Sequence, residues 1–370
     1  MNYEERKELL ANVERIRGGR TLLCFFNFDR ASDPQLPGLA TQFHADVKEA
    51  IFRILKESGP LNGVDLCLYT RGGDTNSVWP IVSLLREFDP SFEVLAPFRC
   101  HSSGTLVALG ARRIVLGPLS ELSPIDPSTG NQFNPRDPAD PRSRMAISVE
   151  DVRAYRDFIA EQLKGKVPKP DQQIEIPEAS LAPFLQRLTQ EVHPLALGNV
   201  HRVLRQIQQL ATKLLNLHPS KGEDVGAIVS SLTTHFYSHL HMINRHEAKD
   251  ILGGRVEFAS DDLAAAMDAL LRAYEDSFNL RKTFFLASYL KGKPEAEVRF
   301  VGAVAETRSW SYLHETSGIV RQTTRIPPNV QVQIPAGQPM PLVPGLPRDT
   351  ELQVSSQGWI HNISPKGVTI

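Results

Sequence analysis

The sequence predicts an α/β protein built on a parallel sheet, with a helical elaboration and a small β-rich module after it. The apolar run at 21–28 is continuous rather than alternating, which is typical of a strand buried on both faces, and further strands are expected at 64–69, 92–98 and 113–116. Helical patterns separate the runs, and alternating strands and helices favour right-handed crossovers in one parallel sheet. In the last 75 residues, clusters of β-formers alternate with proline-rich turns.

The first half of the chain supplies the strands and helices of the predicted core. A charged helix is expected at 4–17, because its apolar residues share one face and Gly18-Gly19 follows it. Further helices are expected at 40–57, 75–87 and 103–110, the last made mostly of small residues. Residues 117–146 contain six prolines and form a long loop, a length that favours a functional role.

The second half begins with a helix at 148–164, for which Ser148 and Asp151 form a capping pair. Residues 165–180 are expected to be a linker. Two helices, joined at His193-Pro194, are expected within 178–217, and further helices at 223–233, 244–252 and 261–280. Strands are expected after them, at 298–304, 319–324, 330–334 and 352–360. We therefore divide the chain into a core (1–170), a helical elaboration that completes it (171–295) and a β-rich module (296–370).

Composition narrows the possible partners. The 370 residues carry a net charge of -1, which provides no electrostatic footprint for nucleic acid or an anionic membrane. The charged N-terminus precedes no signal-peptide run, and no segment approaches the ~20 apolar residues of a membrane span. The three cysteines lie in apolar runs, an odd and sparse set that favours a reduced environment. We expect a cytoplasmic protein with no transmembrane anchor.

Two motifs at strand ends carry the candidate chemistry. Gly72 and Gly73 follow the second strand in Thr70-Arg71-Gly72-Gly73, and such a turn can present unshielded N–H groups to an oxyanion. Ser102 follows the third strand in Ser102-Ser103-Gly104-Thr105, ahead of a helix. The carboxyl ends of parallel strands form the usual site of an open α/β sheet. The alternatives are a helix N-cap at Ser102 and an ordinary turn at the glycines.

The order of these motifs, followed by Ile125-Asp126-Pro127, resembles the crotonase-like peptidases, which include the Clp proteolytic subunit and signal peptide peptidase A. Over about residues 15–255 the chain resembles the serine dehydrogenase proteinase family in particular. The resemblance implies a Clp/crotonase-like core and a serine peptidase that cleaves peptides or proteins. It also implies Ser102 as nucleophile, with Ser103 as the intervening residue of Ser-x-Gly, and a homo-oligomer.

The general base is the open question. At the position where the Clp subunit has its histidine this chain has Asp126, and an aspartate with an ordinary pKa of ~4 is a poor base alone. Asp126 can instead orient a distal histidine, and His239 or His241, ahead of Glu247-Ala248, would complete a Ser-His-Asp set. One alternative is that Asp126 only anchors a turn. Another is that a lysine is the general base, as in signal peptide peptidase A, and the nearest lysines after Ser102 are Lys164, Lys166 and Lys169.

Other chemistries are less well supported by the residues. His235, His239 and His241 have a spacing compatible with a metal, but no partner carboxylate or cysteine is evident, so we expect no metal and no cofactor. Cys100 is a rival nucleophile, but it ends a strand that is expected to be buried, which makes this role less favoured. An acyl-coenzyme-A enzyme of the crotonase fold and a catalytically inactive peptidase-like scaffold are the alternative functions.

Overall fold

The computed structural model describes residues 2–29, 32–33, 43–126, 128–137, 144–164, 178–220, 222–236, 238–324, 345 and 348–361. Some sequence-based predictions lie outside these residues: the strand at 330–334, residues 165–177 of the linker with Lys166 and Lys169, and Pro127 and Tyr237 of the quoted motifs.

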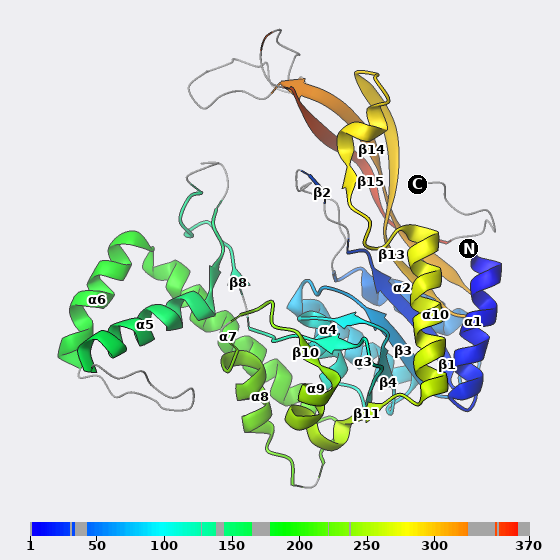
Figure 1. The fold of residues 1–370 in the computed structure, drawn as a ribbon, viewed down its shortest axis with the longest axis horizontal. Coiled ribbons are helices and arrows are strands. Elements are labelled where there is room, and N and C mark those ends of the chain that lie inside the picture. The colour runs from blue at the N-terminus through cyan, green and yellow to red at the C-terminus, as the bar shows by residue number, and fades with distance from the viewer. Residues whose placement is uncertain are drawn as a thin grey trace.

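An eight-stranded sheet forms the centre of the molecule, in the order β11–β6–β4–β3–β1–β13–β14–β15 (Figure 1). Its strands are β1 (Thr21–Asn27), β3 (Val64–Tyr69), β4 (Glu93–Ala96), β6 (Ile114–Leu116), β11 (Val256–Phe258), β13 (Glu295–Glu306), β14 (Ser311–Thr324) and β15 (Arg348–His361). The strands from β11 to β1 pair in parallel, whereas β13, β14 and β15 add antiparallel pairs. The α/β class with a parallel sheet, helices and C-terminal strands is confirmed.

The apolar run at 21–28 forms a central strand because both of its faces are covered. Leu23 and Phe25 belong to one hydrophobic core, while Leu22, Cys24 and Phe26 belong to another, and all five are fully buried. Alternate residues of a strand point to opposite faces of a sheet, so each face requires its own apolar side chains. This explains the continuous apolar run.

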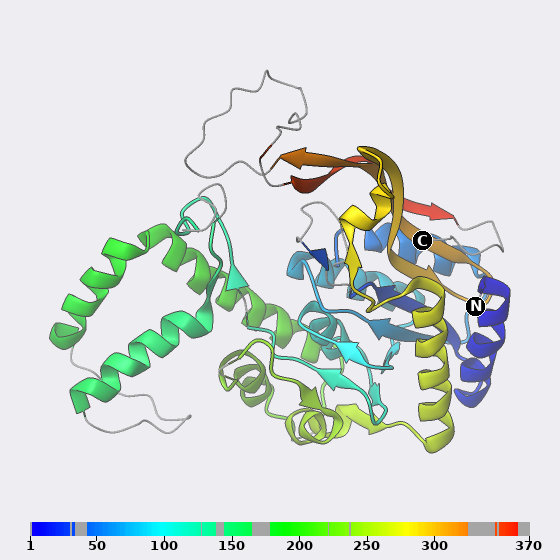
Figure 2. The ribbon, with the colours of Figure 1, turned by 45° about the horizontal axis from the view of Figure 1, so that its top comes forward.

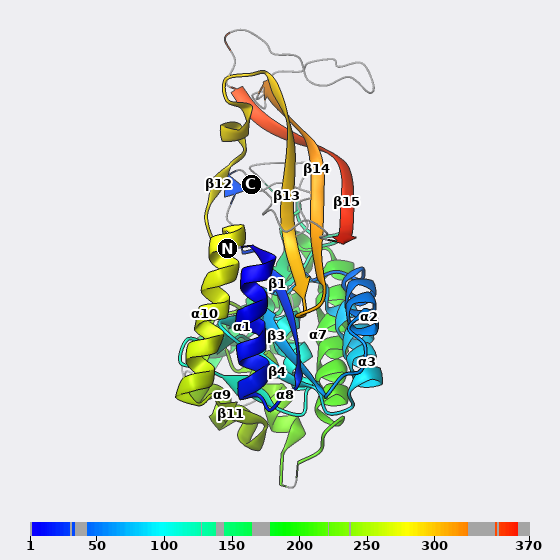
Figure 3. The same cartoon turned by 90° about the vertical axis from the view of Figure 1, so that its right-hand side faces the viewer.

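Helices cover both faces of the sheet and give the fold three layers (Figure 3). One face packs against α2 (Val47–Glu57), α3 (Val78–Phe88), α4 (Ser103–Leu109), α7 (Pro194–Leu215), α8 (Val225–Thr234) and α9 (Arg245–Leu252). The other face packs against α1 (Tyr3–Ile16) and α10 (Asp261–Phe278), which lie side by side. Apart from the start of α2, these helices lie within a few residues of the ranges that the sequence predicts.

Two predicted elements differ from the structure. The strand predicted at 92–98 splits, because Pro97 follows β4 and has no N–H for the ladder; β5 (Arg99–Cys100) then joins a separate sheet, in the order β10–β7–β5. The helix predicted at 40–57 begins at Val47 in the described part of the chain. Phe43 is not helical because its N–H and C=O bond to Gly72 and Asp74.

A buried ion pair connects α1 to the far end of the chain. The Arg6 guanidinium donates to Glu306 of β13 over 2.9 Å, and both side chains are almost inaccessible to solvent. The Tyr274 hydroxyl of α10 donates to the same carboxylate over 2.7 Å. Since a buried charge needs a partner, this cluster fixes α1, α10 and β13 relative to one another.

Two helices project away from the sheet (Figures 1 and 2). They are α5 (Val149–Lys164), which begins with the predicted Ser148–Asp151 capping pair, and α6 (Glu178–Glu191). Phe158 and Leu185 on these helices are more than half exposed. Of the helices in the described ranges, none has both the length and the apolarity needed to cross a bilayer.

The remaining elements are short and connect the layers. The strands are β2 (Ser32–Asp33), β7 (Glu121–Leu122), β8 (Ser128–Thr129), β9 (Ile147–Ser148), β10 (Ile243–Asn244) and β12 (Phe284–Phe285). The single turns of 3₁₀-helix are η1 (Thr75–Ser77), η2 (Gly253–Arg255) and η3 (Leu286–Leu290). The long strands β13 to β15 continue the central sheet beyond the helical layers (Figure 3).

Candidate active site

Ser102 lies at the junction between β5 and α4 in a strained backbone conformation. Its φ of 50° and ψ of −112° lie outside the regions that L residues favour. The other non-glycine residues with positive φ in the described part of the chain, Asn279 and Lys291, are ordinary left-handed residues that follow helices. Strain of this kind costs on the order of 1–3 kcal/mol and concentrates at functional sites.

Hydrogen bonds from the following loop hold this conformation in place. The Ser102 N–H donates to the Ser123 hydroxyl over 2.7 Å. The Ser123 N–H in turn donates to the Thr105 hydroxyl over 3.2 Å, and Thr105 donates to the Cys100 carbonyl over 2.8 Å. The ring of bonds therefore joins both ends of the β5–α4 junction to the segment that leads to Asp126.

The structure places the Gly-Gly turn directly against Ser102. A Cβ on Gly72 would lie 2.7 Å from the Ser102 Cβ and 3.2 Å from its Oγ, so only glycine fits here. The glycine of Ser-x-Gly has a similar role, since a Cβ on Gly104 would lie 2.6 Å from the Thr70 Cγ2. The two motifs that the sequence separates by about thirty residues thus meet at one point.

The N–H groups at this point differ in their availability. The Gly72 N–H already donates to the Thr70 hydroxyl over 3.0 Å. Phe43 pairs with the Gly72 carbonyl and the Asp74 N–H, so the peptide groups of Gly73 itself face away from Phe43. The Gly73 carbonyl accepts from the Ser103 hydroxyl over 2.8 Å, so this side of the turn faces the N-terminus of α4. The first N–H groups of a helix have no partner within it.

His239 and Asp126, 113 residues apart in the sequence, form a hydrogen-bonded pair. His239 Nδ1 lies 2.9 Å from Asp126 Oδ1, and the aspartate side chain is only 2% exposed while that of His239 is 40% exposed. The hydrogen bond to Asp126 raises the pKa of His239 above its ordinary value of 6.5, although burial and the charge of Arg71 oppose the shift. The pair has the geometry of the acid and base of a triad.

The charges around His101 relate the His239–Asp126 pair to Ser102, the residue that follows His101. Burial, together with the charges of Arg71, Arg99 and His239, lowers the pKa of His101 to about 3. His239 is therefore within electrostatic range of the residue that precedes Ser102. Within the described ranges no hydrogen bond joins the Ser102 hydroxyl to His239, and such bonds often tighten only when substrate binds.

The other histidines of the distal segment have different partners. His241 Nε2 lies 3.0 Å from the Glu247 carboxylate, and the His241 ring stacks on Phe236 at 4.4 Å. The structure thus separates His241 from the Asp126 pair. Among the residues that the structure describes, no group of three or more His, Cys, Asp or Glu side chains has a geometry that could hold a metal ion.

The rival nucleophile Cys100 is less suited to catalysis than Ser102. Cys100 is fully buried, and burial raises the pKa of its thiol well above 9.0, which disfavours the thiolate. Lys164 ends α5, on the projecting pair of helices, and its side chain lies outside the described residues, as do Lys166 and Lys169.

Sequence reasoning missed several neighbours of the site. Ser123, two residues before the Ile125-Asp126-Pro127 motif, was not predicted to belong to the site, although its hydroxyl accepts the Ser102 N–H. His101 directly precedes the serine, and that adjacency was the available signal. Glu150, at the start of α5, gave no signal; burial raises its pKa to about 7, the charge of Arg153 opposes the shift, and the like charge of Asp126 adds to it.

Sequence comparison finds relatives whose function is not described. No family model matches the chain. Two proteins of Methanocaldococcus jannaschii, both named as uncharacterized, align with part of it. MJ0137 is 26% identical over 130 residues, which cover 32% of this chain and 46% of that protein. MJ1495 is 24% identical over 180 residues, which cover 45% and 61%. The chain therefore spans only about half of these relatives.

Structure comparison finds the membrane-bound stomatin-specific protease 1510-N, in two single-residue mutants. One covers 66% of this chain and 92% of that chain, with 13% identity and a TM-score of 0.33. The other, in complex with a substrate peptide, covers 72% and 95%, with 14% identity and a TM-score of 0.32.

Proposed function

We propose that this chain is a serine peptidase that uses Ser102 as nucleophile, His239 as general base and Asp126 as the acid that orients the histidine. The observation that carries the proposal is the strained Ser102, seated on the Gly72-Gly73 turn at the N-terminus of α4. A helix cap alone requires no such strain, because an N-cap residue ordinarily has extended backbone angles.

In this proposal, the Ser102 Oγ attacks the carbonyl carbon of the scissile peptide bond and its proton passes to His239 Nε2. The bond between His239 Nδ1 and Asp126 supports this role, because it leaves Nε2 free to accept a proton. The same proton then passes to the leaving amine as the C–N bond breaks, and water hydrolyses the resulting ester. Each step retains the total charge.

The oxyanion in this proposal is held by backbone N–H groups. The sequence favours Gly72 and Gly73, and the hydrogen bond from Gly72 to Thr70 supports Gly73 as the donor. The second donor is the N–H of Ser103, which begins α4 and lies next to the attacking oxygen. Loss of one donor typically costs about 10²–10³ in rate.

Labelling by a fluorophosphonate probe tests the proposal directly. We expect the probe to modify wild-type protein at Ser102, the Ser102→Ala variant to remain unlabelled, and His239→Ala to label several powers of ten more slowly. Ser103→Ala is the matched control, because its hydroxyl bonds only the Gly73 carbonyl in this region and its loss should be milder. A wild-type protein that never reacts would instead favour the inactive scaffold or the acyl-coenzyme-A chemistry, neither of which needs a serine nucleophile.

The proposal includes a homo-oligomer that shields the site. The exposed apolar side chains Phe158 and Leu185 on α5 and α6 support this, since solvent contact with large apolar groups is unfavourable. Light scattering should give a mass of at least twice the 41.2 kDa of one chain. A strict monomer at micromolar concentration would remove the enclosed chamber from the proposal.

A further inference from the structure

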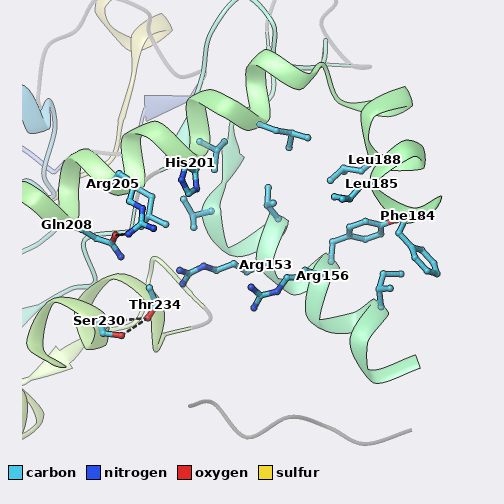
Figure 4. Close-up of a pocket in the computed structure, with 17 residues that line it drawn as sticks. Arg153, Arg156, Phe184, Leu185, Leu188, His201, Arg205, Gln208, Ser230 and Thr234 are labelled. Carbon is cyan, nitrogen blue, oxygen red and sulfur yellow. Dashed lines mark hydrogen bonds between the residues drawn. The ribbon is translucent and has the colours of Figure 1, made fainter. Parts of the chain in front are cut away.

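A cavity of about 560 Å³ lies where the projecting helices α5 and α6 meet α7 and α8 (Figure 4). Its walls are largely apolar and come from Val152 and Ile159 of α5, Leu188 of α6, and Val200 and Leu204 of α7. Apolar walls around a volume of this size are typical of ligand-binding clefts.

The cavity also gathers positive charge. Arg153 and Arg156 reach into it from α5, and His201 and Arg205 reach into it from α7 (Figure 4). Of the described residues that line the cavity, none is aspartate or glutamate. The lining is therefore apolar with a one-sided cationic rim.

The arginines of this rim are incompletely paired. Arg153 lies 3.8 Å from Glu150, a loose contact, and Arg156 bonds its own neighbour Asp157. Arg205 contacts the Gln208 amide at 3.5 Å, and no carboxylate of the described residues pairs with it. A guanidinium without a carboxylate partner has the donors to bind one from a ligand.

Hydrogen bonds connect two helices of the cavity to the loops of the candidate active site. Gln206, next to Arg205 on α7, donates to Asn76 over 2.7 Å, and Asn76 lies three residues after Gly73. Gln208 contacts Thr233 of α8, and the neighbouring Leu232 carbonyl accepts from Ile125, the residue before Asp126. Hydrogen bonds therefore link α7 and α8, two helices that form the cavity, to the segments that follow the Gly-Gly turn and precede Asp126.

We infer that this cavity binds an apolar segment of the peptide substrate that carries a carboxylate, with Arg205 as a main contact. That the bound peptide is a substrate rests on the proposed peptidase function. Apolar side chains of the peptide pack against the helical walls, and its carboxylate pairs with Arg205, which has only the Gln208 amide as a partner among the described residues. The carboxylate can belong to an acidic side chain or to the C-terminus of the peptide, since the guanidinium recognises the same group in both.

Direct binding to the Ser102→Ala protein tests the inference without catalysis. The probes are three rhodamine-labelled peptides of about eight leucine, valine and alanine residues: one with a free C-terminal carboxylate, one amidated, and one amidated with a central glutamate. Fluorescence anisotropy should show that at least one carboxylate-bearing peptide binds about tenfold more tightly than the neutral one, and the difference should shrink with salt.

Variants on one face of α7 supply the control. Arg205→Gln should remove most of the tenfold preference, whereas Arg202→Gln, one turn earlier and outside this cavity, should retain it. A preference for the free C-terminus alone identifies end recognition, and a preference for glutamate alone identifies an acidic side chain; both support the inference. Equal affinity for all three peptides, no binding of any, or equal effects of the two variants would overturn it. Because binding is measured on Ser102→Ala, a failure of probe labelling in the wild type would refute only the peptidase proposal.

Discussion

Replacement of Gly72 by alanine tests whether the Gly-Gly turn holds the Ser102 side chain. Gly72 has a φ of +105°, and an added Cβ would lie 2.7 Å from the Ser102 Cβ and 3.2 Å from the His101 carbonyl. The first distance is about 0.8 Å shorter than the optimal separation of two carbon atoms. The turn must therefore open, or Ser102 must move.

The expected magnitudes follow from these two effects. Backbone strain at this φ costs on the order of 1–3 kcal/mol, and overpacking against Ser102 adds about 1–3 kcal/mol. We expect the free energy of unfolding to fall by about 2–6 kcal/mol in a urea titration followed by circular dichroism. A shift of the serine by nearly 1 Å should slow fluorophosphonate labelling by about 10²-fold.

A second glycine separates the two effects. Gly18 also has a positive φ, +69°, but an added Cβ there would meet nothing within 4 Å. Gly18→Ala should therefore cost only the strain, about 1–2 kcal/mol, and label at the wild-type rate. Labelling of Gly72→Ala at the wild-type rate, with a stability equal to that of Gly18→Ala, would refute the contact between the turn and the nucleophile.

Two further predictions concern charge. Because His239 must be neutral to accept a proton and Asp126 raises its pKa, labelling should increase with pH through a step above 6.5. Asp126→Asn should move this step to lower pH while slowing the maximal rate, and a step that stays in place would exclude His239 as the base. Glu306→Gln should lower the free energy of unfolding by about 3–5 kcal/mol, because it removes the carboxylate charge to which the buried Arg6 donates. Glu4→Gln, in an exposed pair, should change that free energy by less than about 1 kcal/mol, and equal effects in urea titrations would contradict the argument.

The local pattern of the chain predicts much of the core. The continuous apolar run at 21–28 identifies β1, because a strand that is buried on both faces needs apolar side chains at successive positions. The break at Pro97 is a local effect that a stricter use of the proline rule predicts. Helix α7 begins where His193-Pro194 indicates, since proline suits the first turn of a helix.

The arrangement of the site depends on distant residues and is less visible in the sequence. The backbone strain at Ser102 is imposed by Ser123 and by the turn at Gly72. The residues next to Ser102 in the sequence therefore do not predict it. The pairing of His239 with Asp126 crosses 113 residues, and only the resemblance to a family pointed to it. The like charges at Glu150 and Asp126 meet only because α5 packs near the loop, which local propensity does not encode.

The position of β1 has a consequence for synthesis of the protein. This strand lies between β3 and β13. β3 follows it closely in the chain, whereas β13 comes much later, so that Cys24 of β1 pairs with Glu306 of β13. A ribosome adds roughly 5–20 residues per second, so the second edge of β1 stays uncovered for tens of seconds after the strand emerges. An exposed apolar strand edge is prone to aggregate, and the nascent chain is therefore a natural client for a chaperone during that interval. For the same reason, truncation before β13 should harm the N-terminal core and not merely remove the end of the chain.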